Sequence, residues 1–424
     1  TTLTLGANND TVALGTGAAF SGGIGAVKWE TTPQTGSFQA AAGRGYFMNT
    51  TSGALTLTLP SGSAGAIVAV SDYARTFQTN NLTISPQSGE KIGGVAEDLT
   101  LNVNGQALTL VYVDSTKGWI NVQNAEDTVT ASNFIDATGG TITSCGNDKI
   151  HTFTGPGTFA VTRVHPCAAN NQVSYMVVGG GGGSGSANGG YGTGGGGAGG
   201  FREDKSPVTP YTASPLEGAG PITVTATSYP ITIGAGGAAG TEPTPNLGSA
   251  GGTSTFSTIT SAGGGQTQGN GGSGGGGGPG HSTGVGSGGT GNTPPVTPSQ
   301  GSNGGPGGHT AGGVGAGGGG GATAVGGTAT TGPSAVAGPG GAGATTEING
   351  SSTAFAGGGG GATNKGAPAI GPGGAGGGGT GSNPTCDGSN GTANTGGGAG
   401  GANGNPVPGK TGGSGIVIIR YKAQ

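Results

Sequence analysis

Charged side chains are scarce in this sequence. Its 424 residues include 13 Lys and Arg and 17 Asp and Glu, which is 7% of the chain and leaves a net charge of -4. About a quarter of the residues in an average globular protein are charged. Binding to nucleic acid relies on clustered Lys and Arg that displace counterions from phosphates, and the sequence has no such cluster. We therefore expect no nucleic-acid partner.

Long apolar runs are missing as well. The longest run is much shorter than the about 20 apolar residues that a membrane-spanning helix needs, and no segment resembles a signal peptide. No stretch has the 3.6-residue apolar period of an amphipathic helix. The sequence therefore predicts an all-β protein with almost no α-helix and no membrane insertion.

Cysteine is rare, with residues only at positions 145, 167 and 386. Three cysteines without a C-x-x-C pair do not form a disulfide framework. Cys145 and Cys167 lie near His151 and His165 in the sequence, but the spacing fits no usual zinc pattern. Cys145 and Cys167 are therefore either joined by a disulfide bond or present as two free thiols. We expect no bound metal and no cofactor.

Residues 37–127 contain seven short runs rich in Thr and β-branched residues, most of which alternate apolar and polar side chains. Such runs, separated by Gly, Asn, Asp, Ser and Pro, predict β-strands. The seven runs are residues 46–48, 55–59, 66–70, 81–84, 99–103, 108–113 and 118–122. Their close spacing predicts a β-sandwich or a small barrel.

Glycine dominates the second half of the chain. A small β domain is predicted for residues 128–178, and from residue 179 to residue 424 glycine is the main residue, with 110 in the whole chain. Such a composition is typical of a flexible linker. Two features oppose that interpretation. Apolar strand-like runs at 173–178 and 415–421 bracket the segment, and glycine blocks recur roughly every 40 residues, as in repeat proteins.

We expect the glycine blocks to form rods joined by loops. Collagen is excluded because no strict Gly-X-Y period is present. The remaining extended helix has three residues per turn and no internal hydrogen bonds, so its N–H and C=O groups need partners on neighbouring rods. Only glycine allows backbones to approach so closely on several sides. The sequence therefore predicts a domain of packed polyglycine II helices over 179–424, closed by pairing of strands 173–178 and 415–421.

One motif is typical of a nucleotide site. Residues 404–411 match the phosphate-loop pattern G-x-x-x-x-G-K-[ST], but a strand follows it where a helix is needed, and Pro406 and Pro408 remove two backbone donors. We expect no nucleotide at Lys410. The carboxylates of the N-terminal half show no sign of converging as a glycosidase requires. We therefore expect the protein not to be an enzyme.

Rigid scaffolds carry recognition on their loops, and exposed aromatic side chains bind sugar faces and apolar patches. Large or charged side chains between the glycine blocks are thus candidate receptor contacts. They are Tyr191, Phe201, Arg202, Tyr211, His281, His309, Phe355 and Lys365. The alternatives are that each aromatic caps the end of a rod stack, and that the charged run 202–205 is a solvated loop.

Several strings resemble modules of bacteriophage fibre proteins. They are Gly45–Pro60 (GYFMNTTSGALTLTLP), Val68–Arg75 (VAVSDYAR), Leu110–Trp119 (LVYVDSTKGW), Lys149–Phe159 (KIHTFTGPGTF) and Gly413–Tyr421 (GSGIVIIRY). Their order is similar to that in marine phage tail fibres of the cyanophage and pelagiphage type. The glycine-rich half is similar in composition to adhesin domains in which polyglycine helices stack and the intervening loops touch the receptor.

The resemblance implies a virion fibre protein that acts outside the cell. It implies a homotrimer that binds a bacterial surface receptor, either a protein or a glycan, and that contacts other virion tail proteins. Residues 1–36 resemble a fibre shaft and 37–127 a fibre module. The alternatives are a head fibre or structural filament without receptor specificity, and a depolymerase of surface polysaccharide.

Overall fold

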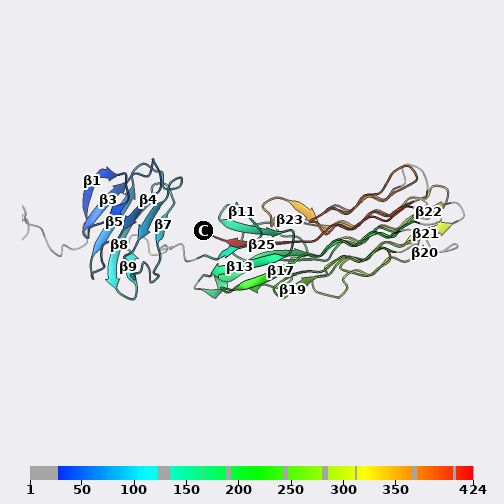
Figure 1. The fold of residues 1–424 in the computed structure, drawn as a ribbon, viewed down its shortest axis with the longest axis horizontal. Coiled ribbons are helices and arrows are strands. Elements are labelled where there is room, and N and C mark those ends of the chain that lie inside the picture. The colour runs from blue at the N-terminus through cyan, green and yellow to red at the C-terminus, as the bar shows by residue number, and fades with distance from the viewer. Residues whose placement is uncertain are drawn as a thin grey trace, which may run out of the picture. The chain divides into compact units, whose positions relative to one another are not determined.

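Strands and extended glycine segments make up nearly all of the structure. The computed structural model describes residues 27–122, 134–165, 167–187, 192–241, 247–278, 285–310, 313–364, 370–403 and 407–423. Within these ranges the helical content is the single 3₁₀ turn η2 (Ala168–Asn171), and no helix has the length and apolar character to cross a membrane. Two units divide the chain at residues 133 and 134 (Figure 1). The all-β prediction is confirmed.

The first unit is a β-sandwich. One sheet has the order β1 (Lys28–Gln34), β3 (Arg44–Met48), β5 (Ile67–Asp72), β8 (Ala107–Asp114) and β9 (Gly118–Asn121), and the other has the order β2 (Phe38–Gln39), β4 (Leu55–Thr58), β6 (Leu82–Ser85) and β7 (Leu99–Leu101). Alternate residues such as Met48, Leu57 and Ile84 meet in one buried core between the sheets. All seven predicted strands are present, in a sandwich and not in a barrel.

The shaft-like segment predicted for 1–36 needs correction at its end. Strand β1 pairs in parallel with β3, with Trp29 opposite Gly45, so residues 28–34 belong to the sandwich. Their sequence, KWETTPQ, lacks the alternation that marks the other strands, and the pairing depends on a partner strand already in place. Residues 1–26 lie outside the described residues.

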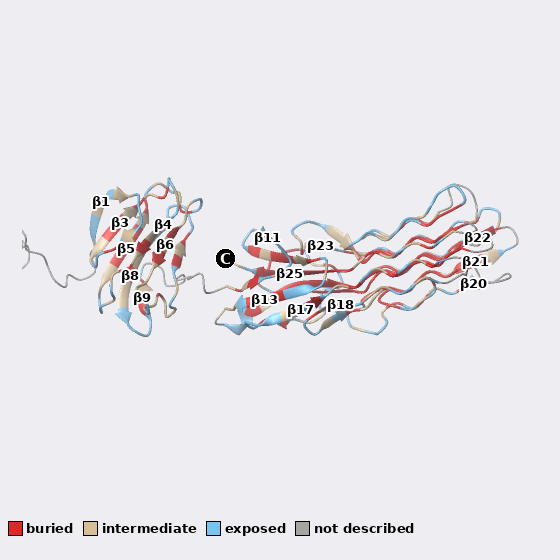
Figure 2. Ribbon diagram, viewed as in Figure 1, coloured by how far each residue is buried: buried red, intermediate tan, exposed pale blue. Residues whose placement is uncertain are grey.

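The second unit begins with two packed sheets. The outer sheet has the order β10 (Asp136–Thr138), β13 (Gly157–Arg163), β17 (Ser228–Thr232), β18 (Ser254–Phe256) and β19 (Ile259–Ser261). The inner sheet has the order β11 (Thr141–Cys145), β12 (Asp148–Phe153), β25 (Ile416–Lys422), β14 (Gln172–Val178) and β15 (Phe201–Asp204), with β16 (Ile222–Thr223) paired to β14. Both faces of β14 and β25 are buried, which explains why their apolar runs are continuous (Figure 2).

The predicted closure of the glycine-rich segment is confirmed. Strands β14 and β25 pair antiparallel, with Tyr175 opposite Ile419 and Val177 opposite Val417. Strand β25 also pairs with β12, so the last strand of the chain lies between two strands of the region predicted as a separate domain at 128–178. That boundary is therefore wrong, because residues 134–178 and the glycine-rich segment share one sheet and form one unit.

The glycine blocks form a lattice of hydrogen-bonded rods. In the rod formed by residues 179–184, the N–H groups reach three neighbouring rods in turn, and groups three residues apart reach the same neighbour. Gly179 and Gly182 donate to Gly200 and Gly197 on the first neighbour, and Gly180 and Gly183 donate to Gly252 and Ser249 on the second. Gly181 and Ser184 donate to Gly413 and Lys410 on the third, and all six N···O distances lie between 2.8 and 3.0 Å. This three-residue repeat is that of the polyglycine II helix.

Carbonyl groups extend the same lattice. The carbonyls of Gly180, Gly181 and Gly182 accept from the N–H groups of Gly264, Gly237 and Ala399, which lie on three further rods. A central rod is thus surrounded by backbone on six sides. Rods 195–200, 317–322 and 357–362 repeat this arrangement, and the predicted domain of packed polyglycine helices is confirmed.

Outer rods carry side chains at one position in three. Along the rod that follows β17, residues 232, 235, 238 and 241 are exposed, whereas Gly234, Gly237 and Gly240 are buried. The exposed residues are Thr and Ala, and the buried ones are glycine because they face neighbouring rods. Central rods have no outward side, and so they are almost entirely glycine, with the small side chain of Ala198 as a buried exception.

The side chain of His151 links strand β25 to the residue that follows β10. Its Nδ1 lies 2.7 Å from the carbonyl oxygen of Gly139 and its Nε2 lies 3.0 Å from the hydroxyl of Tyr421. Nδ1–H therefore donates to the carbonyl, and Nε2 accepts from the Tyr421 hydroxyl, whose pKa burial raises. Burial also lowers the pKa of His151 below its ordinary value of 6.5.

This burial predicts a loss of stability in weak acid. The folded state binds the His151 proton less readily than the unfolded state does, so stability present above pH 6.5 is lost as the pH falls below it. We expect the melting temperature of the second unit to fall between pH 7.5 and pH 5.5. The fall should be smaller in His151→Gln, because this variant lacks the imidazole that binds the proton. The carboxylates titrate in both chains, so their effect cancels in the comparison. Equal slopes for the two chains, measured by calorimetry, would contradict this assignment.

Candidate functional site

The rods run outward from the sheets and back, so their connections gather at the end of the second unit opposite β25, here called the distal end (Figure 1). Strands β20 (Val285–Gly286), β21 (Gly307–Thr310) and β22 (Gly313–Gly315) lie at this end. Ala187 bridges Val407, and Gly315 bridges Thr363. These bridges bring together parts of the chain that are far apart in the sequence.

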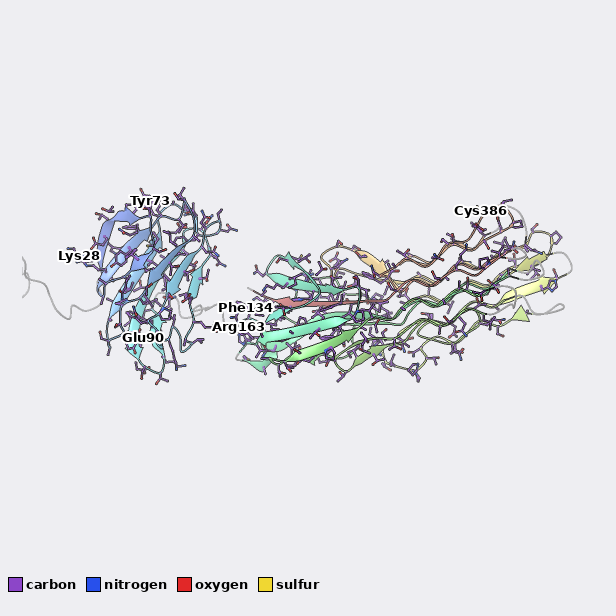
Figure 3. The ribbon with its side chains drawn as sticks, viewed as in Figure 1. Lys28, Tyr73, Glu90, Phe134, Arg163 and Cys386 are labelled. Carbon is purple, nitrogen blue, oxygen red and sulfur yellow. The ribbon has the colours of Figure 1, made fainter. Side chains whose placement is uncertain are left out.

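Neutral groups dominate the described part of the distal end. Val285 is 73% exposed, Thr310 is exposed, and the imidazole of His309 is half-buried on β21. Exposed Cys386 also lies here (Figure 3), on a turn in which the side-chain oxygen of Asn383 accepts its N–H at 2.8 Å. The chemistry available is that of hydroxyl, amide, imidazole, thiol and aliphatic groups, with the exposed carboxylate of Asp387 beside Cys386.

Among the described residues, one of the eight candidate contact residues lies at the distal end. His309 is at the distal end, on β21. Tyr191, His281 and Lys365 lie outside the described residues. For His309, the sequence signal of a large side chain between glycine blocks marks the end of a rod.

The other four candidates are buried at the opposite end, and their prediction as exposed contacts is wrong. Phe201, Tyr211 and Phe355 pack with Met176 and Ile418 in one apolar cluster. This cluster covers the inner sheet where the lattice begins, so the aromatic rings close the end of the rod stack. Arg202 is also buried, on strand β15.

The charged run 202–205 is not a solvated loop either. Glu203 is fully buried, and its carboxylate accepts from the hydroxyls of Tyr211 and Thr346 at 3.2 and 2.6 Å and from the N–H of Ser214 at 2.9 Å. Burial raises the pKa of Asp204, and a hydrogen bond from the N–H of Gly220 opposes that effect. These groups hold the segment after β15 against the sheet.

The disulfide predicted as one alternative for Cys145 and Cys167 is absent. Both residues are free cysteines. Cys145 ends β11 beside Gly350, where a Cβ would lie 3.4 Å from its sulfur. The N–H of Cys167 donates to Nδ1 of His165 at 2.8 Å, which holds this residue in a separate turn before η2.

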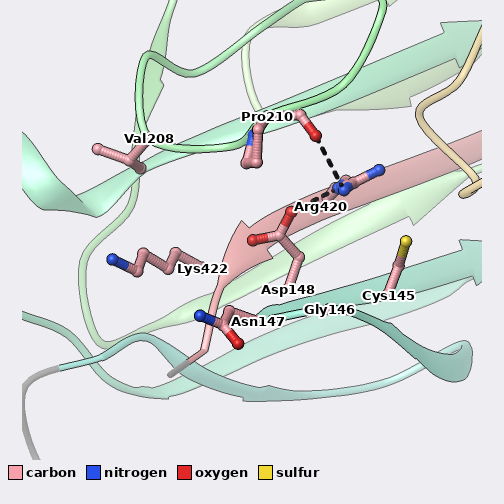
Figure 4. A pocket seen from close by; sticks show the side chains of 8 residues that line it. All are labelled: Cys145, Gly146, Asn147, Asp148, Val208, Pro210, Arg420 and Lys422. Carbon is pink, nitrogen blue, oxygen red and sulfur yellow. Dashed lines mark hydrogen bonds and ion pairs between the residues drawn. The ribbon is translucent and has the colours of Figure 1, made fainter.

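A cavity of about 540 Å³ lies beside the end of β25 (Figure 4). Its lining residues are Cys145, Gly146, Asn147, Asp148, Val208, Pro210, Arg420 and Lys422. Arg420 Nε donates to Asp148 at 2.7 Å, and its two terminal nitrogens donate to the carbonyls of Glu347 and Pro210. The guanidinium thus holds three segments together through one hydrogen bond from each of its nitrogens. In the described parts of the chain no three metal-ligating side chains converge.

The described part of the phosphate-loop match, residues 407–411, lies within the lattice. The N–H groups of Gly409 and Gly412 donate to the carbonyls of Gly240 and Gly237, both at 2.9 Å. The N–H of Lys410 donates to the hydroxyl of Ser184 at 2.8 Å. The donors that a phosphate would need are therefore already engaged in the rod stack.

Fold and lattice together define the class: an all-β protein whose larger unit is a glycine scaffold stabilised by backbone hydrogen bonds. Residues 152–422 match the glycine-rich domain family. Because this match covers more than half of the chain, the protein belongs to that family.

Part of the chain is also similar to a phage protein. Over 94 residues, which are 21% of this chain, it is 33% identical to the baseplate wedge protein gp10 of Enterobacteria phage T4. The match spans 15% of the length of that protein. The similarity thus links a segment of this chain to a phage baseplate protein.

Proposed function

We propose that the protein is a non-enzymatic bacteriophage virion fibre protein, whose distal end binds a receptor on the surface of the bacterial host. The observation that carries the proposal is the arrangement of the rods. A lattice stabilised by its own backbone bonds needs nothing from the connections at its distal end, so those connections are free to vary. The similarity of a segment to a phage baseplate protein supports a place in the virion.

The chemistry of the lattice surface favours a neutral contact. Between residues 218 and 415 the charged residues are Glu242, Glu347, Lys365, Asp387 and Lys410. Long-range electrostatic steering needs clustered charge, which this segment lacks. Hydroxyl, amide and aromatic groups recognise both glycans and protein surfaces by short-range contacts. We therefore propose a protein or glycan receptor, and not a polyanion.

The proposal includes assembly. The distal end of the second unit is assigned to the receptor, and we assign the sandwich unit to contact with other virion tail proteins. Three copies are proposed per fibre, since joining identical binding ends raises avidity without new contacts.

Adsorption competition tests the receptor assignment. Purified protein should block phage adsorption to host cells, and Lys365→Ala combined with His309→Ala should raise the blocking concentration at least about tenfold, the effect of losing about 1.4 kcal/mol of binding. The matched control, Lys422→Ala with His165→Ala at the other end of the same unit, should stay within about twofold. Both variants should melt as the unaltered chain does.

Each rival function has its own outcome in this assay. A structural filament without receptor specificity would not compete at any concentration. A depolymerase would release soluble sugar from host envelopes, which reducing-end analysis of the supernatant would detect. Either result would replace the proposal.

A further inference from the structure

The two sheets of the sandwich differ sharply on the sides that face away from their shared core. On the sheet β2-β4-β6-β7 the outward row across three strands is Thr56, Thr83 and Thr100. On the sheet β1-β3-β5-β8-β9 the corresponding row is Ile67, Val111 and Ile120. None of these six residues belongs to the core between the sheets. One molecule thus carries a hydroxyl-covered sheet face and an aliphatic one.

The aliphatic face continues to both edges of its sheet. At the β1 edge the rings of Trp29 and Phe47 lie 4.9 Å apart, and the Trp29 side chain lies over Gly45 with 37% of the residue exposed. At the β9 edge Val122 is 58% exposed. Exposed apolar side chains gathered on one face mark an interaction site. We call residues Trp29, Phe47, Ile67, Val111, Ile120 and Val122 the apolar face.

We infer that the apolar face is the surface on which copies of this chain meet about a threefold axis. The inference rests on the homotrimer of the proposed function and assigns its contact. The middle of the apolar face carries no charged residue, and Asp114, opposite Gly118 at the end of β8, lies beyond it, although each chain has a net charge of -4. Copies that meet here therefore bring no like charges into direct opposition, and like charges placed opposite each other in a low-dielectric contact repel strongly.

The shape of the apolar face is also complementary to that of a second copy. Its β1 edge is raised by two aromatic rings, and its centre is low because Ala69 and Thr109 stand opposite each other there. The raised edge of one copy can pack into the low centre of the next. A head-to-tail contact of this kind closes into a ring when its rotation is a whole fraction of a turn, and three copies give a closed fibre.

Sedimentation equilibrium on the full chain, with two matched lysine variants, tests the inference. Val111→Lys places a charge in the middle of the apolar face, and Thr83→Lys places the same charge in the middle of the hydroxyl row of the other sheet. We expect the unaltered chain and Thr83→Lys to sediment as trimers, and Val111→Lys to show a threefold lower mass. Circular dichroism spectra of all three should agree below the melting transition, because neither position contributes to the core. Val111→Lys should melt at a lower temperature than the other two, because assembly stabilises the folded chain by mass action.

Tryptophan fluorescence identifies what covers the face. The chain has two tryptophans, of which Trp119 is fully buried in the core, so acrylamide reports on Trp29. We expect Trp29 to be shielded in the trimer and quenched in Val111→Lys.

Three results would overturn the inference. A Val111→Lys trimer would disprove the assigned face and leave the trimer intact. If the unaltered chain is a monomer, both the assigned face and the proposed trimer are disproved. A monomer with Trp29 shielded at every concentration would show that the chain covers its own face. Adsorption competition remains an independent test of receptor binding.

Discussion

Gly319→Val should abolish the fold of the second unit while leaving the sandwich unit folded. A Cβ at residue 319 would lie 2.0 Å from the carbonyl oxygen of Gly196 and 2.5 Å from its carbon. Overpacking typically costs about 1–3 kcal/mol where side chains can move aside. Here the obstructing atoms are backbone, and they cannot move without breaking lattice bonds.

Those bonds raise the expected cost. The N–H of Gly319 donates to Gly359 at 2.8 Å, and its carbonyl accepts from Gly341 at 2.9 Å. Each lost bond costs about 1 kcal/mol, and more when a buried group is left without a partner. We expect a loss above about 4 kcal/mol, in the range that only a few mechanisms reach. Calorimetry should show the transition of the sandwich unit without that of the lattice.

Ala342→Val is the matched control. Residue 342 follows Gly341, the partner of Gly319, but its side chain is exposed on an outer rod. This change adds two methyl groups to an exposed side chain, and it should change stability by no more than about 0.5 kcal/mol. If Gly319→Val melts within a few degrees of Ala342→Val, the packed lattice is refuted.

Arg420→Ala should be the most damaging change outside the glycine segment. The pair between Arg420 and Asp148 is buried, with side chains only 4% and 3% exposed, and the guanidinium also lies over the ring of Tyr211. Removing one partner of a buried ion pair typically costs about 3–5 kcal/mol, because the other charge stays buried without compensation. β25 would lose its anchor to the segments at Pro210 and Glu347.

Two further variants separate charge from packing. Arg420→Met with Asp148→Asn removes both charges and should recover part of the loss. Lys149→Ala breaks a pair with Asp136 that is more than one third exposed on both sides, and it should cost no more than about 1 kcal/mol. Equal unfolding free energies for Arg420→Ala and Lys149→Ala in urea titrations would contradict the anchoring role.

Local patterns were enough to predict much of the fold. Strands such as β6 and β8 alternate because one face is buried, and the continuous apolar runs of β14 and β25 predict a strand pair buried on both sides. The glycine blocks predict a lattice because no other packing uses so many backbone groups. Strand β1 was missed because its residues do not alternate and its place depends on pairing with β3.

The candidate site was only partly predictable, for a reason that lies in the lattice. A large side chain between glycine blocks stands either at the distal end, as His309 does, or where the lattice meets the sheets, as Phe201 and Phe355 do. Both places interrupt a glycine run, so composition alone cannot separate them. The direction in which each rod runs determines at which end of the lattice the side chain lies. That direction follows from pairing between segments that are distant in the sequence. One buried partner of Glu203, the hydroxyl of Thr346, is likewise distant in sequence.

Hydrogen exchange across residues 263–414 tests the ordered lattice most directly. Rods 317–322 and 357–362 lie in the interior, and each N–H along them donates to a neighbouring rod. If the lattice opens only with the whole unit, exchange there should be slower than in an unstructured peptide by a factor on the order of 10⁴ or more, as domain stabilities of about 5–15 kcal/mol imply. Exchange throughout 263–414 at the rate of an unfolded peptide would show a flexible linker and would contradict the account.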